Sequence, residues 1–171
     1  MLHIYTGNGK GKTTAAVGLA VRATGAGKSV TFIQFLKNGT SSEIELLKKL
    51  GIEVACTECC NKFTSAMNEE ELDELIAEHN ALLRQAGRLI NNGKTDMLVL
   101  DEFIGTYNKE LLDTVIAEKL IADALSTDCE LVLTGRDAPQ TLCLLADYIT
   151  EMLPHKHPYE KGIPARKGIE F

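Results

Sequence analysis

Residues 5–14 read YTGNGKGKTT, and this stretch decides the fold. It follows a short β-rich run, LHIYT (residues 2–6), and precedes a segment rich in Ala and Leu. In the phosphate-binding pattern, a Gly and four further residues precede Gly-Lys-Ser/Thr. The closing part of this pattern is present here as GKT (residues 11–13). At the first position of the pattern the chain has Thr6 in place of Gly. Strand, Gly-rich loop and helix in this order predict a nucleotide-phosphate site.

Each part of the loop has a physical role in holding phosphate. Backbone N–H groups of a Gly-rich turn converge on phosphate oxygens, and the following helix adds its positive N-terminal end. Lys12 would supply a cation to the terminal phosphates, and the Thr13 hydroxyl a ligand to magnesium. Lys10 adds a second positive charge within the loop. We therefore predict that ATP binds to a set of eight loop residues: Gly7, Asn8, Gly9, Lys10, Gly11, Lys12, Thr13 and Thr14.

A second element, MLVLDE (residues 97–102), is an apolar run that ends in two carboxylates. Ligands of open α/β sheets bind beyond the carboxyl ends of the strands, so Asp101 and Glu102 are expected to face the same crevice as the loop. One carboxylate would hold Mg²⁺ (or Mn²⁺) directly or through water, and the other would orient that water. The alternative is a solvated acidic pair at a strand end. We predict a metal site made of Thr13, Asp101 and Glu102.

The stretch TGRDAP (residues 134–139) leaves a further apolar run in the same direction. Arg136 would then project near the phosphates, where its planar donor group suits anionic oxygen. The alternative is an exposed Arg in a loop that caps a helix. We include Arg136 among the expected ATP-binding residues.

The chain as a whole alternates apolar runs with amphipathic segments. Strands are expected at 2–6, 29–35, 52–56, 95–102 and 129–135, and helices from 12 to about 25 and at 41–51, 69–90, 108–124 and 139–146. Strands that alternate with helices require crossover connections, and they form a parallel sheet covered on both faces. An apolar stretch, YITEML (residues 148–153), precedes the tail. We predict one P-loop NTPase-like, three-layer α/β domain over residues 1–171, with a mostly parallel sheet and an irregular tail at 154–171.

The bulk composition excludes several classes of protein. A length of 171 residues suits one domain with a sizeable core. The net charge of −6 argues against a broad nucleic-acid surface, because such affinity is dominated by Lys and Arg contacts. No run approaches the roughly 20 apolar residues that span a bilayer, and too few residues precede the loop for a secretory signal. We expect a cytoplasmic protein that binds neither nucleic acid nor membrane.

The five cysteines are an odd number in a chain with a good core, which predicts reduced thiols rather than a disulfide framework. Three of them, Cys56, Cys59 and Cys60, lie in the stretch CTECC. A structural zinc site usually needs four ligands, with a second pair at similar spacing, and the sequence has no such pair. We interpret the cluster as free thiols in a loop.

Four stretches together resemble the P-loop corrinoid adenosyltransferases: YTGNGKGKTTAAVGLAVRATGAGKSVTFIQFLK, LVLDE, LVLTGRDAPQTLCLLADYITEM and the tail KHPYEKGIPARKGIEF. In that family the tail, with its Lys-His, aromatic, acidic and Gly residues and its closing Lys-Gly-Ile-acidic-aromatic pattern, is more distinctive than the loop. The resemblance covers nearly the whole chain and is weakest at residues 39–68. The family's loop also begins Thr-Gly-Asn-Gly-Lys-Gly-Lys-Thr, so Thr6 is similar to the family's own residue.

The resemblance implies an enzyme that transfers the 5′-deoxyadenosyl group of ATP to the cobalt of a reduced corrinoid and releases intact triphosphate. Co(I) is itself a very strong nucleophile, so the protein would hold the ribose C5′ in line and stabilise charge on the triphosphate. Lys12, Thr13 and Glu102 would serve the second task. The resemblance also implies a homodimer, and an electron donor such as a flavoprotein as a partner.

The resemblance further implies residues that expel the lower axial ligand from cobalt. The family uses bulky apolar residues in a segment resembling Gly-Phe-Thr-Trp, and the matching stretch here is NKFTS (residues 61–65). Phe63 would be the wedge and Thr64 its neighbour in a corrinoid site. Ser65 stands at the Trp position, and the chain contains no Trp. Many relatives also carry a segment before the first strand that helps to cover the corrinoid, whereas the sequence here starts at the strand. The resemblance therefore implies that both departures concern the part of the site that binds the corrinoid.

Two other classes of protein pair a P-loop with an acidic strand end. A small-molecule kinase, such as a thymidine-kinase-like protein, usually carries a four-Cys zinc element, whose second pair is missing here. An ATPase that acts as an ATP-gated switch would not require the pattern of residues found in the tail. We expect a transferase.

Overall fold

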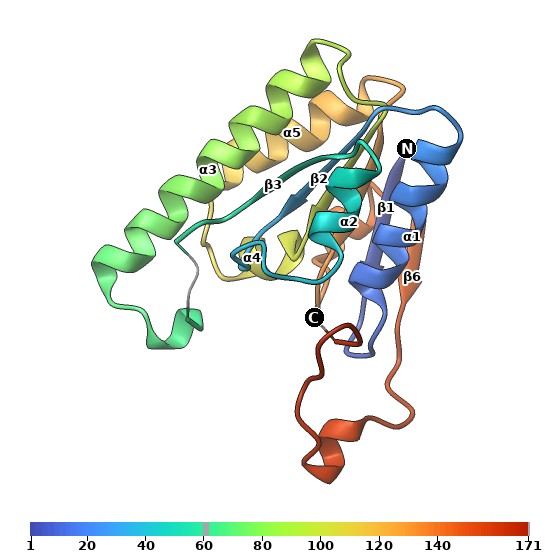
Figure 1. The fold of residues 1–171 in the computed structure, drawn as a ribbon. Helices are drawn as coiled ribbons and strands as arrows, with labels where there is room; N and C mark the ends of the chain where they lie inside the picture. Colours follow the sequence, from blue (N-terminus) through green and yellow to red (C-terminus); the bar gives the residue numbers. More distant parts are fainter. Residues whose placement is uncertain (60–61, 171) are drawn as a thin grey trace.

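The structure is a computed structural model that describes residues 1–59 and 62–170. At its centre lies a six-stranded sheet in the order β3-β2-β4-β5-β1-β6, in which all neighbours run parallel (Figure 1). The predicted parallel α/β sheet is confirmed. Its strands are β1 (Leu2–Thr6), β2 (Val30–Gln34), β3 (Glu53–Cys56), β4 (Met97–Asp101), β5 (Glu130–Thr134) and β6 (Tyr148–Glu151).

Helices cover both faces of the sheet, which makes the predicted three layers (Figure 1). On one face lie α1 (Lys12–Gly25) and α2 (Ile44–Lys49). The other face is covered by α3 (Glu69–Asn91), α4 (Phe103–Asn108) and α5 (Thr114–Leu125), together with Leu142 of the short α6 (Gln140–Cys143). Two 3₁₀ helices, η1 (Thr64–Ala66) and η2 (Pro158–Lys161), lie in the connections.

The central strands are mostly apolar because both of their faces are covered. Every residue of β2 and of β4 is buried. Successive side chains of a strand point to opposite faces. Along β4, Leu98 and Leu100 therefore pack beneath α3 and α5, whereas Met97 and Val99 pack beneath α1 and α2. Such runs are typical of a parallel sheet between two helical layers.

Three local predictions differ from the structure. The helix expected at 108–124 is wrong at its start: α4 ends at Asn108, and α5 begins only at Thr114. The Asp113 side chain accepts hydrogen bonds from the N–H groups of Val115 and Ile116 at 2.9 and 3.3 Å, and this cap sets the new start.

The helix expected at 41–51 is shorter in the structure: α2 begins at Ile44 and ends at Lys49. The stretch YITEML contains a sixth strand, β6, that we had not assigned; it pairs with β1 at the edge of the sheet.

The tail follows this strand, runs away from the sheet and returns, so that its end lies beside the loop that follows β1 (Figure 1). Among the described residues, no helix is both long and apolar enough to cross a bilayer.

Candidate nucleotide-binding site

The P-loop rests on the backbone that follows β6. The N–H of Gly9 donates a hydrogen bond to the carbonyl of Met152 at 2.7 Å. A Cβ at Gly7 would lie 2.5 Å from that carbonyl oxygen, and a Cβ at Gly9 would lie 2.7 Å from it. Gly7 also has a φ of 95°, in the region that favours glycine. These two glycines therefore permit close packing on the sixth strand, and the Gly9 amide is used for that packing.

The first turn of α1 continues directly from this loop. The helix starts at Lys12 after Gly11, and among the described residues no side chain caps it. The first N–H groups of a helix have no partner within the helix, and they carry the positive end of its dipole. Backbone donors at this point suit a phosphate group.

Lys12 folds back over its own loop. Its ammonium group donates hydrogen bonds to the carbonyls of Gly7 and Gly9 at 2.7 and 2.9 Å. Partial burial lowers the pKa of Lys12, and the nearby charge of Arg136 lowers it further. Glu102 and Asp101 act in the opposite direction. The ammonium is therefore held beside the loop, close to the charged residues that follow β4 and β5.

Asp101 is fully buried at the end of β4, and its carboxylate accepts four hydrogen bonds. Oδ1 accepts from the hydroxyls of Thr13 and Thr134 at 2.8 and 2.7 Å. Oδ2 accepts from the Gln34 amide at 3.0 Å and from the Lys37 ammonium at 3.3 Å. A carboxylate has about four acceptor positions, so these donors fill it. Asp101 thereby fixes the Thr13 hydroxyl at the edge of the sheet.

Unlike Asp101, whose side chain is buried, Glu102 has a side chain that lies at the cavity. Its backbone is left-handed, with a φ of 61°, and its N–H donates to the Thr134 hydroxyl at 2.9 Å. Its side chain lines the cavity beside the P-loop. Burial, and then the charge of Asp101, raise the pKa of the Glu102 carboxyl. Of the two predicted carboxylates, Glu102 is the one that reaches the cavity.

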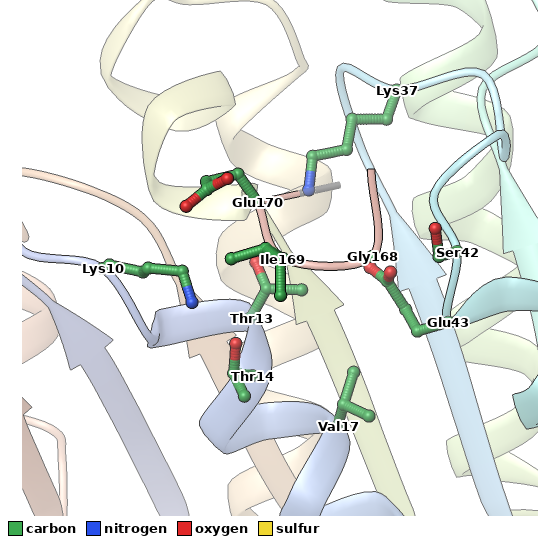
Figure 2. A pocket seen from close by; sticks show the side chains of 10 residues that line it. All are labelled: Lys10, Thr13, Thr14, Val17, Lys37, Ser42, Glu43, Gly168, Ile169 and Glu170. Atoms are coloured by element: carbon green, nitrogen blue, oxygen red, sulfur yellow. The ribbon is translucent and has the colours of Figure 1, made fainter. Parts of the chain in front are cut away.

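Two adjoining cavities lie along the P-loop. The smaller, of about 230 Å³, is lined by residues 8–14 together with Glu102 and Arg136, so it brings together the predicted loop, acidic and arginine residues. The larger, of about 410 Å³, extends over the first turn of α1 toward Ser42 and Glu43 (Figure 2). Both cavities are lined by six common residues: Lys10, Thr13, Thr14, Lys37, Ile169 and Glu170.

The tail forms the outer wall of these cavities. Gly168, Ile169 and Glu170 lie opposite the first turn of α1 (Figure 2). The Glu170 carboxylate forms an ion pair with Arg166, in which Nη2 lies 3.1 Å from Oε1. Hydrogen bonds from Arg166, and more weakly the charge of Lys10, lower the pKa of the Glu170 carboxyl. The tail, which only the resemblance marked as distinctive, therefore lines the candidate site.

The two expected corrinoid residues lie outside both cavities. Phe63 precedes η1, and its side chain is 86% exposed. The Thr64 hydroxyl accepts a hydrogen bond from the Lys109 ammonium at 3.4 Å. Asn61 of the same stretch is outside the described residues. The structure thus presents Phe63 as an exposed apolar side chain, away from the phosphate site.

Four of the five cysteines lie in the part of the chain that the structure describes. Cys56, Cys59, Cys129 and Cys143 form no disulfide, whereas Cys60 lies outside the described residues. Within residues 1–59 and 62–170, no group of three or more His, Cys, Asp or Glu side chains is placed to hold a metal by itself.

Three of the four side chains that donate to Asp101 had not been predicted as site residues: Gln34, Lys37 and Thr134. A polar residue that interrupts an apolar run, as Gln34 and Thr134 do at the ends of β2 and β5, is the available sequence signal. Lys37 follows β2 by three residues, so the carboxyl-edge rule that selected Arg136 would have selected it too.

Comparisons with known proteins agree with this geometry. A model of the family described as "ATP:corrinoid adenosyltransferase BtuR/CobO/CobP" matches residues 1–171. Corrinoid adenosyltransferase CobA of Salmonella typhimurium is 36% identical over 172 residues, which cover 98% of this chain and 84% of that protein. The corrinoid adenosyltransferase of Escherichia coli K12 is 34% identical over the same shares of the two chains. That of Pseudomonas aeruginosa is 34% identical over 174 residues, which cover 100% of this chain and 83% of that protein.

Proposed function

Since the chain belongs to the ATP:corrinoid adenosyltransferase family, we propose that its P-loop cavities are the place where that family's reaction occurs. The protein is an ATP:corrinoid adenosyltransferase: it transfers the 5′-deoxyadenosyl group of ATP to the Co(I) centre of a reduced corrinoid and releases triphosphate. The observation that supports this location is the cavity in which loop residues 8–14 meet Glu102 and Arg136.

The bond changes define what the site must do. The electron pair of Co(I) forms the Co–C5′ bond, while the C5′–O bond breaks and leaves its pair on the triphosphate. No proton is transferred, so no general base is needed. The protein contributes by holding C5′ in line and by stabilising the charge that develops on the leaving oxygen.

The triphosphate would be held by the loop and by its cations. Lys12 and Lys10 supply ammonium groups from the loop itself, and Arg136 adds a guanidinium from the end of β5. The uncapped N-terminus of α1 adds backbone N–H donors. Lys12 would exchange its carbonyl contacts with Gly7 and Gly9 for phosphate oxygens. Cations held around the triphosphate stabilise the charge that develops on it in the transition state.

We propose that Mg²⁺ (or Mn²⁺) is held by Thr13 and Glu102, with Asp101 orienting the Thr13 hydroxyl. The donors fit this ion, since hydroxyl and carboxylate oxygens are the ligands that magnesium prefers. The described residues offer no protein cage, and Mg²⁺ is commonly held by one or two carboxylates together with substrate phosphates. When bound, the ion would neutralise charge on the phosphate oxygens.

The corrinoid would meet the protein at Phe63 and Thr64. A phenylalanine that is 86% exposed is a large apolar surface, and it suits contact with a flat macrocycle. From there Phe63 would occupy the space of the lower axial base. Four-coordinate Co(II) is easier to reduce, so this displacement would assist formation of Co(I).

Further proposals concern the setting of the enzyme. We propose that residues 1–171 act as one domain, in the cytoplasm, as a homodimer. An electron donor such as a flavoprotein would supply the single electron that converts Co(II) to Co(I). The match of one family model to residues 1–171 supports the single-domain proposal.

An anaerobic spectral assay tests the function. Purified protein, ATP and Mg²⁺ are mixed with chemically reduced Co(I) cobalamin, and the visible spectrum is followed. We expect conversion to the adenosylated spectrum, and loss of that conversion when a chelator removes the divalent ion. ATP cleavage to ADP without alkylation would instead support a kinase or an ATPase.

A further inference from the structure

We propose that Lys37 is a further cation of the triphosphate site, and that it binds the phosphates from the end of β2. The inference rests on the proposed function in one respect, namely that the triphosphate occupies the P-loop cavities. Lys37 lies outside the P-loop motif, and none of the roles described above uses it.

The register of the sheet brings Lys37 to the correct edge. Strand β2 pairs with β4 so that Gln34 lies beside Asp101. Three residues later the Lys37 ammonium lies 3.3 Å from Oδ2 of Asp101. Because β4 also leads into Glu102, the two strands place Lys37 at the same carboxyl edge as the acidic pair.

The backbone at this edge is strained at several residues, one of which, Leu36, directly precedes Lys37. In the described part of the chain, four residues other than glycine have a positive φ. Three of these, Leu36, Glu102 and Asp137, follow the ends of β2, β4 and β5. A bulky residue such as Leu rarely adopts this conformation, and such strain concentrates at functional sites. Glu102 lines the cavity itself. Leu36 directly precedes Lys37 and Asp137 directly follows Arg136, and both of these charged residues line the cavity.

The Lys37 side chain is placed to reach a ligand. It is 32% exposed, whereas its partner Asp101 is fully buried. It lines both cavities and extends from the loop after β2 into the space over the first turn of α1 (Figure 2). A lysine that served only to neutralise Asp101 would need no such access.

The charge balance also favours a role for Lys37. Apart from Lys37, the lining of the two cavities contains three cations, Lys10, Lys12 and Arg136, and three carboxylates, Glu43, Glu102 and Glu170. Without Lys37 these side chains would cancel in charge, which suits a polyanion poorly. Lys37 makes the lining net positive. Asp101 would still accept bonds from Thr13, Thr134 and Gln34 without Lys37, so the acidic residue does not require its charge for hydrogen bonding.

Binding of inorganic triphosphate with Mg²⁺, measured by calorimetry in the absence of corrinoid, tests the proposal. We expect Lys37→Met to weaken triphosphate binding about ten-fold or more, because a charged hydrogen bond is lost. Lys37→Arg should stay within about three-fold of the wild type, because it keeps the positive charge. Lys94→Met is the matched control, since Lys94 is exposed before the amino end of β4 and should leave binding unchanged.

Two results would overturn the assignment. One is triphosphate binding by Lys37→Met at wild-type strength. The other is an equal loss in Lys37→Met and Lys37→Arg with a matching fall in melting temperature, which would mean that Lys37 only supports the local structure. The measurement uses no corrinoid, so a failure to adenosylate would count against the proposed reaction and leave the Lys37 result standing.

Discussion

The hydroxyl oxygen of Thr13 lies 2.8 Å from Oδ1 of Asp101, and this hydrogen bond joins the P-loop helix to the end of β4. The carboxylate behind it is fully buried and accepts three other hydrogen bonds. Thr13 is therefore held by a group that can hardly move. The position of the proposed metal ligand depends on the sheet as well as on the loop.

This contact predicts that Asp101→Asn is costly. An amide places N–H donors where the carboxylate accepts from Thr13, Thr134, Gln34 and Lys37, so some of these donors lose their acceptor. We expect the free energy of unfolding to fall by about 2–3 kcal/mol, measured by urea denaturation. Asp73→Asn, on the exposed face of α3, is the control and should change it little. A stability equal to that of the wild type would contradict the four-bond description of Asp101.

Lys12→Ala should remove most of the stabilisation of the triphosphate. We expect adenosylation to slow by about 100-fold or more, because a preorganised charge at the leaving group is lost. Initial rates under saturating ATP, together with the affinity for ATP, give the measurement. Lys28→Ala, an exposed lysine away from the loop, should behave as wild type. Full rate and full ATP affinity in Lys12→Ala would show that the role of Lys12 is wrong.

Phe63→Ala should separate the two substrates. ATP affinity should be unchanged, because Phe63 lies outside the phosphate cavities. Reaction with Co(II) corrinoids that retain a lower base should slow in the presence of a reductant, whereas a corrinoid without a lower base should react normally. Val115→Ala, another exposed apolar residue, is the control. Equal losses with both corrinoids, or a loss of ATP binding, would refute the wedge role.

His79 predicts a pH dependence of stability. It is fully buried, and its Nδ1–H donates to the Leu111 carbonyl at 2.7 Å. Burial lowers the pKa of His79 below its ordinary value of 6.5, and the bond to Leu111 offsets this only in part. The unfolded chain therefore binds the proton first as the pH falls. The stabilisation is present above 6.5 and is lost as the pH falls from there through the folded pKa.

Urea unfolding at about pH 7.5 and about pH 5.5 checks this prediction. The difference in stability between the two conditions should shrink in His79→Leu, although that variant is less stable overall because the Leu111 carbonyl loses its donor. His155→Ala, an exposed histidine, should keep the wild-type difference. An unchanged pH dependence in His79→Leu would rule out His79 as its source.

Much of the fold could be predicted from the sequence because the spacing of apolar residues distinguishes strands from helices. The buried strands read as apolar runs, and the loop between β1 and α1 carries its own motif. The missed start of α5 has a local cause, since the cap at Asp113 divides what reads as one helical segment. β6 was missed because all four of its residues are exposed at the sheet edge, so no pattern of burial marks it.

The site was predictable where residues follow strands and less so where contacts join distant segments. Asp101, Glu102 and Arg136 were placed by the rule for carboxyl ends of strands. The same rule could not show that Asp101 is surrounded by four donors while Glu102 reaches the cavity. Nor could it place Glu170 and Lys10 at the same cavity, because the position of Glu170 depends on the path of an irregular tail.

The fate of the triphosphate tests the central claim most directly. Wild-type protein, ATP, Mg²⁺ and a Co(I) corrinoid are allowed to react without oxygen, and the phosphorus products are counted by ³¹P NMR against the adenosylated corrinoid. The account predicts one intact triphosphate for each adenosyl group transferred. Formation of ADP and phosphate in place of triphosphate would contradict it, because the bond broken would then lie between phosphates and not at C5′.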